Sequence, residues 1–449
     1  MRREERLGGT GPSPPRRSRL AGRSDRGSLR RMSPPSLAEG LSRSRALVCA
    51  GTGGVGKTTI AAALGLRAAM QGRRTLILTI DPARRLADAL GLEGLDSTPT
   101  AVELPASGSP ETAPGGGALD AMMLDPKPTF DRLVTRLAQD EATLERILGN
   151  RIYRHLSQAL AGSADYAAME QVHEMVECGR YDLVIVDTPP SSHALDFLRA
   201  PRRLREFLES RFVRALLRPA MSASRLGFRV FGRSLHRIFG LLDRIAGASF
   251  LDDLTEFLSA IDGLSEGFRD RASRVERILL GDHTSFVLIC GASSGSEPNT
   301  LEFLDELDAL DVRLAALIVN RVRPWPVGEG AGAWLARANA EGSAGDAEKL
   351  RAAFEETATS GIAEAKSRAE HKRHASDLLA ALEETAHACD EADRTIEILS
   401  ARAARLRVRC HSVPELADDV ARLEGLLEIG AALCGKASGT RRSPAEAPA

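Results

Sequence analysis

Residues 51–59 read Gly-Thr-Gly-Gly-Val-Gly-Lys-Thr-Thr and fit the pattern G-x-x-x-x-G-K-[ST]. In this pattern the glycines let backbone N–H groups close around phosphate oxygens, and the start of the next helix adds partial positive charge. Lys57 can reach the β- and γ-phosphates of a nucleotide, and the Thr58 hydroxyl can ligate Mg²⁺. The residues predicted to hold the nucleotide phosphates are Gly53, Gly54, Val55, Gly56, Lys57, Thr58 and Thr59.

Two carboxylates follow apolar runs further along the chain. Asp81 comes after the run that ends at Ile80, and it either orients or deprotonates a water attacking the γ-phosphate or caps a helix beginning at Pro82. The residues alone leave both roles open. Asp187 comes after four apolar residues, which is the usual place of the Mg²⁺-associated carboxylate in phosphate-loop proteins; the alternative is an ordinary turn residue.

These side chains need strands and helices to position them. A strand before the loop and a helix at Ile60–Met70 after it give the context that the loop requires. Most of the strand candidates are apolar on both faces, as strands buried in a parallel sheet are, and helical segments separate them. The predicted fold class is therefore α/β, a doubly wound, mostly parallel sheet with an inserted all-helical subdomain. The predicted strands are Ala46–Cys49, Thr75–Ile80, Leu119–Leu124, Leu183–Val186, Phe286–Cys290, Leu314–Val319 and Leu406–Val408.

Changes in composition along the chain predict its domain organisation. Residues 1–43 form a basic tail rich in Arg, Ser, Pro and Gly that is expected to be disordered, and the small, polar residues 436–449 form a second disordered tail. Residues 44–435 are expected to form the phosphate-loop domain. Within it, residues 204–275 predict a helical subdomain, and residues 340–404 predict a second helical segment.

The predicted helical subdomain carries an apolar stripe beside a basic one. Four arginines, each four residues apart, form the basic stripe: Arg225, Arg229, Arg233 and Arg237. One interpretation is an amphipathic subdomain that packs on the sheet. The other is a surface for an apolar helix, an acidic partner or a membrane.

Composition excludes several functions. The formal net charge is −1 and aromatic residues make up 4% of the chain, so we expect no nucleic-acid partner. The six cysteines are widely spread and form no C-x-x-C pair, which fits a reduced cytoplasmic protein without a zinc or dithiol site. The chain contains no run of about 18 apolar residues, so no membrane-spanning helix is predicted.

The chain resembles the arsenical-pump and tail-anchored-protein-targeting ATPases, also called anion-transporting ATPases, a deviant branch of the phosphate-loop NTPases. The resemblance runs from about Ala46 to Leu433. It rests on motifs that occur in the order of that family: Gly53–Thr59, Asp81-Pro82-Ala83, Asp187-Thr188-Pro189-Pro190 with His193, and Val319-Asn320-Arg321. It also includes Met123-Leu124-Asp125 and the late segment Val413-Pro414. The resemblance implies ATP and Mg²⁺ as ligands.

The resemblance also implies a role for each matched position. Lys57 and Thr58 would hold phosphates and Mg²⁺, and Asp81 would position the attacking water. Asp187 would support Mg²⁺. Asn320 would hydrogen-bond the adenine, and a loop at Val413–Glu415, with Pro414 at its centre, would cover that base.

Three departures from the family pattern bear on function. The family usually has a lysine before the glycine pair that reaches the partner's phosphates across a dimer, and this chain has Thr52 there. The Asp-Pro-Ala motif of this chain continues with Arg84, where the family usually has histidine. Because Arg84 and Arg85 both follow Asp81, either arginine could replace the missing lysine. There is neither a zinc-binding C-x-x-C nor a clear cysteine triad for arsenite.

The resemblance implies a Mg²⁺-dependent ATP hydrolase whose nucleotide cycle opens and closes a dimer. The dimer would be a homodimer or a heterodimer with a related ATPase, acting on a membrane-protein client or a membrane pump partner. Its expected location is the cytoplasm, with peripheral contact to the membrane. The alternative is a low-turnover regulatory or scaffolding subunit of a heterodimer, which Thr52 favours.

Overall fold

The structure is a computed structural model. It describes residues 36–81, 84–105, 116–154, 161–189, 196–209, 249–327, 330–341, 349, 352, 368–416 and 423–434. The C-terminal tail 436–449, most of the N-terminal tail, His193 and the stripe from Arg225 to Arg237 lie outside these ranges. The stretch predicted as a basic tail does include one helix, α1 (Leu37–Arg43), which Ser36 and Glu39 cap reciprocally.

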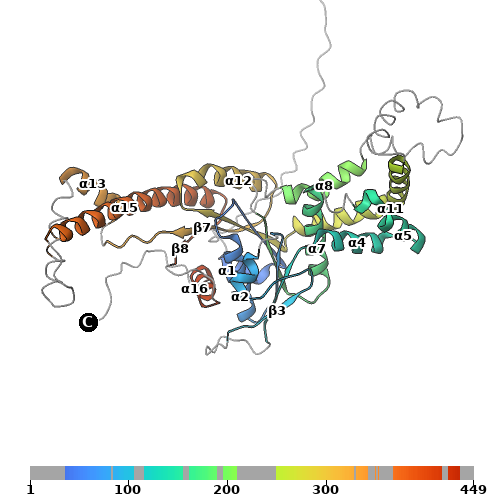
Figure 1. The fold of residues 1–449 in the computed structure, drawn as a ribbon, viewed down its shortest axis with the longest axis horizontal. Helices are drawn as coiled ribbons and strands as arrows, with labels where there is room; N and C mark the ends of the chain where they lie inside the picture. Colours follow the sequence, from blue (N-terminus) through green and yellow to red (C-terminus); the bar gives the residue numbers. More distant parts are fainter. Residues whose placement is uncertain are drawn as a thin grey trace, which may run out of the picture. The chain divides into compact units, whose positions relative to one another are not determined.

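The described chain folds around an eight-stranded sheet with the order β3-β4-β2-β5-β1-β6-β7-β8 (Figure 1). All neighbouring pairs are parallel except β3 and β4, which are antiparallel. The sheet confirms the predicted fold class. The strands are β1 (Ala46–Gly51), β2 (Arg74–Thr79), β3 (Thr100–Val102), β4 (Ala118–Met123), β5 (Leu183–Asp187), β6 (Thr284–Gly291), β7 (Leu314–Val322) and β8 (Cys410–Pro414).

One strand prediction is wrong and one strand was not predicted. Residues 406–408 form the cap of the preceding helix, where Val408 N–H donates to Ala403 and Arg407 N–H donates to Ala404. Arg407 has a left-handed φ of 59°, as such caps require, and the strand begins only at Cys410. The unpredicted strand, β3, has three residues, which is too short to give a periodic signal. The other predicted strands are confirmed within a few residues.

Helices cover both faces of the sheet because alternate strand residues point to opposite sides. Leu47, Ile77 and Ile185 share one core with the helices α1, α2 (Lys57–Met70), α3 (Arg85–Leu90) and α16 (Leu423–Cys434). Val48 and Val186, on the opposite side, share a core with another set of helices. That set is α4 (Pro126–Leu137), α5 (Glu141–Gly149), α7 (Ala161–Glu177), α8 (Asp196–Glu209) and α11 (Ser249–Leu279).

A third core covers the β6–β7–β8 side of the sheet. Leu288, Leu317 and Leu399 belong to it, so α12 (Glu297–Ala309) and the long helix α15 (Arg368–Arg405) pack here. A small separate cluster joins α15 to α13 (Ala331–Glu341) around Trp334, which meets Trp325 edge to face. Helices therefore fill the described part of the predicted segment 340–404. No helix in the described ranges is long and apolar enough to cross a bilayer.

The described part of the helical insertion packs against the rest of the domain. Leu264, Phe268 and Val275 on α11 are buried in the core beneath the sheet. Arg205 on α8 forms an ion pair of 3.0 Å with Glu276 on α11. These contacts fit the interpretation of an amphipathic subdomain packed on the sheet for this part; residues 210–248 lie outside the described chain.

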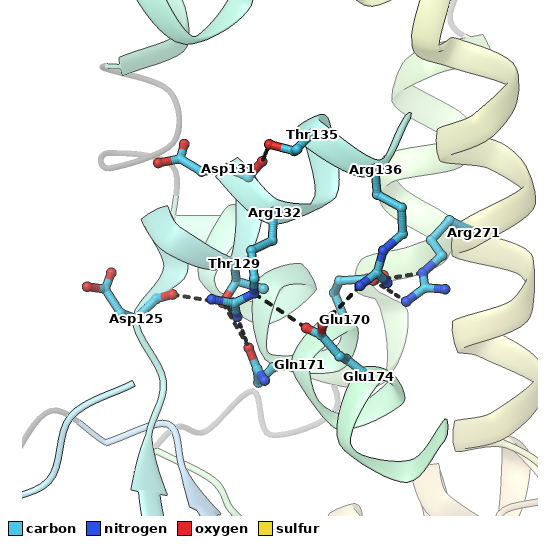
Figure 2. A network of polar contacts seen from close by, with 10 residues as sticks. All are labelled: Asp125, Thr129, Asp131, Arg132, Thr135, Arg136, Glu170, Gln171, Glu174 and Arg271. Atoms are coloured by element: carbon cyan, nitrogen blue, oxygen red, sulfur yellow. Dashed lines mark hydrogen bonds and ion pairs between the residues drawn. The ribbon is translucent and has the colours of Figure 1, made fainter. Parts of the chain in front are cut away.

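A polar seam runs between α4, α7 and α11 (Figure 2). Arg271 on α11 pairs with Glu170 on α7 at 2.6 Å, and these side chains are only 13% and 3% exposed. Arg132 and Arg136 on α4 both pair with Glu174, at 3.5 and 3.0 Å. Buried charges are costly unless they are paired, so this seam fixes how the three helices pack.

His173 lies buried at the same seam, and its Nδ1 atom has no hydrogen-bond partner among the described residues. Burial, together with the positive charges of Arg271, Arg136 and Arg274, lowers the pKa of His173 to about 4. The unfolded chain therefore binds a proton at this residue that the folded chain rejects. The stability that this provides is full above pH ~6.5 and is lost as the pH falls towards ~4.

We expect His173→Gln to flatten this part of the pH dependence, although the substitution itself lowers stability by a constant amount. The check is urea unfolding of both proteins from about pH 7 to about pH 4. The difference in unfolding free energy between wild type and variant should shrink as the pH falls. A difference that is the same at every pH would contradict the prediction.

Candidate nucleotide site

The glycine-rich loop lies between β1 and α2, the strand–loop–helix context that its sequence predicted. Gly56 is the N-cap of α2 and has φ +88°, a backbone conformation that residues with a side chain rarely adopt. A Cβ at this position would also come within 2.3 Å of the Asn320 side-chain nitrogen. Glycine is therefore required at residue 56 for both its backbone conformation and its lack of a side chain.

Lys57 begins α2 and turns back over the loop. Its Nζ donates to the carbonyl oxygens of Gly51 at 3.0 Å and Thr52 at 2.8 Å. Burial lowers the pKa of Lys57, although the nearby carboxylates Asp187 and Asp81 oppose this. The ammonium group thus lies within the electrostatic reach of both predicted acidic residues.

Asp187 ends β5 and is completely buried beside the loop. Its Oδ2 accepts hydrogen bonds from the Thr58 hydroxyl at 2.9 Å and from the Thr79 hydroxyl at 3.0 Å. Its Oδ1 is buried and has no hydrogen-bond partner among the described residues. Burial raises the pKa of Asp187 to about 6, against the opposing effect of the two hydroxyls and Lys57.

Asp81 follows β2, and its backbone N–H donates to the Thr79 hydroxyl at 3.2 Å. Its carboxylate forms an ion pair of 3.5 Å with Arg85. Asp81 is not the cap of α3, which begins at Arg85 and has Arg84 as its N-cap, and the predicted helix start at Pro82 lies outside the described residues. Arg84 and Arg85 are both exposed at this turn.

Thr79 is a site residue that the sequence reasoning missed. One hydroxyl donates to Asp187 and accepts from the Asp81 amide, so it links the two acidic segments. The register of β2 and β5 causes this, because Thr79 and Asp187 are directly paired across the two strands. The signal in the sequence was a hydroxyl residue two positions before Asp81. Only the register of the two strands shows that this hydroxyl lies beside Asp187.

Asn320 lies near the end of β7, buried beside the loop. Its side-chain Nδ2 donates to the Val55 carbonyl at 2.8 Å. Pro414, predicted to lie in a loop over the base, is instead the last residue of β8 and pairs with Val322. Glu415 then follows, and its carboxylate pairs with Arg323 at 3.3 Å. The end of β8 therefore lies next to the end of β7, two residues beyond Asn320.

The predicted phosphate-binding residues lie together at the carboxyl edge of β1. Gly53 and Gly54 are exposed at the tip of the loop, Val55 is buried beneath it, and Thr59 is half-buried on α2. Thr58 and Asp187 meet at the base of the loop. Ligands in open α/β sheets bind outside the carboxyl ends of the strands, which is where these residues lie.

Oxygen donors at the base of the loop fit a magnesium ion. Mg²⁺ prefers oxygen ligands and keeps waters and substrate phosphates in its coordination shell, so one hydroxyl and one carboxylate are enough from the protein. The unpartnered Oδ1 of Asp187 and the Thr58 hydroxyl match that donor set. Among the described residues, no group of three His, Cys, Asp or Glu side chains could hold a metal ion by itself.

A glycine loop of this pattern, between a strand of a parallel sheet and the helix that follows that strand, defines a phosphate-loop NTPase. Residues 44–356 match the sequence model of the anion-transporting ATPase family, and the chain belongs to this family. An "ATPase get3" of Aspergillus terreus is 27% identical over 274 residues, which are 61% of this chain and 71% of the relative. An "ATPase get3" of Aspergillus niger is 26% identical over 274 residues, with the same coverage. The protein is therefore an ATP hydrolase, as the loop and its family resemblance predicted.

Proposed function

We propose that the protein hydrolyses ATP with Mg²⁺ at the glycine loop, with Asp81 positioning the attacking water. The observation that carries this proposal is the Thr79 hydroxyl, which binds the Asp187 carboxylate and the Asp81 amide at once. A water held by Asp81 and a cation held by Asp187 would then keep a fixed relation to each other. Such positioning is the main contribution that a protein makes to phosphoryl transfer.

The other predicted residues have roles that fit this arrangement. Lys57 would exchange its bonds to the loop carbonyls for bonds to nucleotide phosphates. Thr58 and the Oδ1 of Asp187 would hold Mg²⁺, which when bound neutralises charge on the phosphates. The Oδ1 of Asn320 would accept a hydrogen bond from adenine, and Pro414 at the neighbouring strand end would contact the same base.

We also propose that nucleotide binding and hydrolysis drive a dimer through an opening and closing cycle that serves a membrane-related client. Membership of the anion-transporting ATPases and the likeness to proteins named ATPase get3 support this. The connections in the chain support it as well, since Asp187 is followed nine residues later by α8, and Arg205 joins α8 to α11. Loss of the γ-phosphate near Asp187 would thus change how α8 and α11 pack.

Hydrogen exchange tests this cycle. We expect residues 187–209 and α11 to exchange at different rates in the ADP-bound and ATP-analogue-bound proteins, because the first segment begins at Asp187 and α11 pairs with α8 through Arg205 and Glu276. The central strand β1, which is fully buried, serves as the internal control and should be equally protected in both states. Sedimentation of the same two samples reports whether the dimer forms and whether it depends on nucleotide. Identical exchange and identical sedimentation would count against a client cycle.

A second candidate is a low-turnover subunit of a heterodimer, which Thr52 favours. A residue that reaches a partner's phosphates from this position needs a positive charge, and threonine has none. Arg85, one of the two arginines that could replace it, pairs with Asp81 of its own chain. The rate of ATP turnover by the purified protein distinguishes the two functions. If the protein works as its own dimer, turnover should already be present and should depend on dimer formation. If it is a heterodimer subunit, turnover should rise only when a relative with the lysine is added.

A further inference from the structure

Two consecutive residues at the end of β7 both bind the backbone of the glycine loop. Asn320 donates through Nδ2 to the Val55 carbonyl at 2.8 Å, and Arg321 donates through Nη1 to the Gly54 carbonyl at 3.1 Å. Successive side chains of a regular strand point to opposite faces of the sheet. A regular strand would therefore present only one of these two side chains to the loop.

The backbone of Arg321 resolves this conflict. Its φ is 57°, in the left-handed region, and the pairing of β7 with β8 shifts register between Val319 and Val322. This conformation is unfavourable for a residue with a Cβ atom, and strain of this kind collects at functional positions. The Arg321 side chain is exposed, so core packing does not explain the strain. What the conformation gains is the contact between its guanidinium group and Gly54.

The two contacts fix the orientation of two peptide groups in the loop. A trans peptide group is planar, and its C=O and N–H point in opposite directions. Holding the carbonyls of Gly54 and Val55 towards β7 therefore turns the N–H groups of Val55 and Gly56 to the other side, into the loop. Within the described chain, neither of these N–H groups donates a hydrogen bond to the protein. They are available for phosphate oxygens.

We propose that Asn320 and Arg321 form a clamp that holds the glycine loop in its phosphate-binding conformation, with Arg321 as a positioning residue for phosphate binding. The proposal rests on the assignment of residues 53–59 as the phosphate site. It also gives Asn320 two functions, because its Nδ2 holds the loop while its Oδ1 remains for the base. Recognition of the base and the shape of the phosphate loop are then linked through one side chain.

The test is Arg321→Gly, with ADP affinity measured by calorimetry. Glycine adopts a φ of 57° without strain, so this variant loses the guanidinium group and relieves the backbone at the same time. We expect the Kd for ADP to rise about tenfold, the effect of losing one charge-assisted contact. The thermal unfolding midpoint without nucleotide should stay unchanged or rise. A purely structural role for Arg321 would not separate affinity from stability in this way.

Arg407 provides a matched control. It is also an exposed arginine in the left-handed conformation, with φ 59°, but it caps α15 and, within the described chain, forms no hydrogen bond with the loop. Arg407→Gly makes the same changes in charge and backbone and should leave the Kd for ADP at the wild-type value. Arg321→Lys keeps a donor on a long side chain and should recover part of the lost affinity. Without nucleotide, hydrogen exchange of residues 51–59 should be faster in Arg321→Gly than in Arg407→Gly.

Lys57→Ala separates failure of the clamp from failure of the site. If Lys57→Ala loses ADP binding while Arg321→Gly binds ADP like wild type, the clamp is overturned and the phosphate site stands. If Lys57→Ala also binds ADP normally, the phosphate site itself is wrong, and the clamp falls with it. Equal losses of affinity in Arg321→Gly and Arg407→Gly would likewise overturn the clamp, since a general charge effect would then account for both.

Discussion

Asp81→Asn is expected to bind ATP about as tightly as the wild-type protein and to hydrolyse it at least ~10²-fold more slowly. A carboxylate that orients or deprotonates the attacking nucleophile contributes ~10²–10⁴ in rate, and an amide of the same shape cannot take the proton. Binding is retained because the loop and Lys57 are unchanged, and because the Asp81 backbone N–H still donates to Thr79. Phosphate release measured in a single turnover, together with calorimetry using a non-hydrolysable ATP analogue, checks both halves.

Asp88→Asn is the matched control for this prediction. Asp88 lies in the first turn of α3, a few residues from Asp81, and is exposed. The same chemical change there should leave turnover unchanged. Normal hydrolysis by Asp81→Asn would remove the proposed role of this residue, whereas equal losses in both variants would point to a disturbed turn around α3.

The second large effect is on stability. Arg271→Met is expected to destabilise the fold by about 3–5 kcal/mol, because it leaves Glu170 charged and almost fully buried without its partner. Arg271→Met combined with Glu170→Leu should recover most of that loss. Replacing a whole buried ion pair by apolar side chains is often neutral, since both desolvation costs disappear together. Urea unfolding of the two variants and the wild type measures these differences.

Arg136→Ala controls for the general loss of an arginine in the same seam. Its partner is Glu174 at 3.0 Å, and Arg136 is 47% exposed, so we expect a loss of only ~0–1 kcal/mol. If the double variant at positions 170 and 271 were as unstable as Arg271→Met alone, the uncompensated charge would not be the cause. Lost packing between α7 and α11 would then explain the result.

The sequence alone predicted the local parts of this protein. The glycine loop and most of the parallel strands could be predicted because each depends on a short run of neighbouring residues, either a turn that requires glycine or a strand that is apolar on both faces. Strand ends then placed Asp81 and Asp187 at one edge of the sheet, since all parallel strands end there. The assignment of the family followed from the same motifs, and the match over residues 44–356 confirms it.

Tertiary structure decided which polar groups bind one another. Thr79 links Asp81 to Asp187 because β2 and β5 pair in one particular register. Arg321 reaches Gly54, more than two hundred residues earlier, only because its backbone leaves the regular strand conformation. Residue spacing encodes the direction of a side chain within one element, but register and strain arise between elements. For this reason the chemistry of the site could be predicted from the sequence, whereas the hydrogen bonds that hold it in place could not.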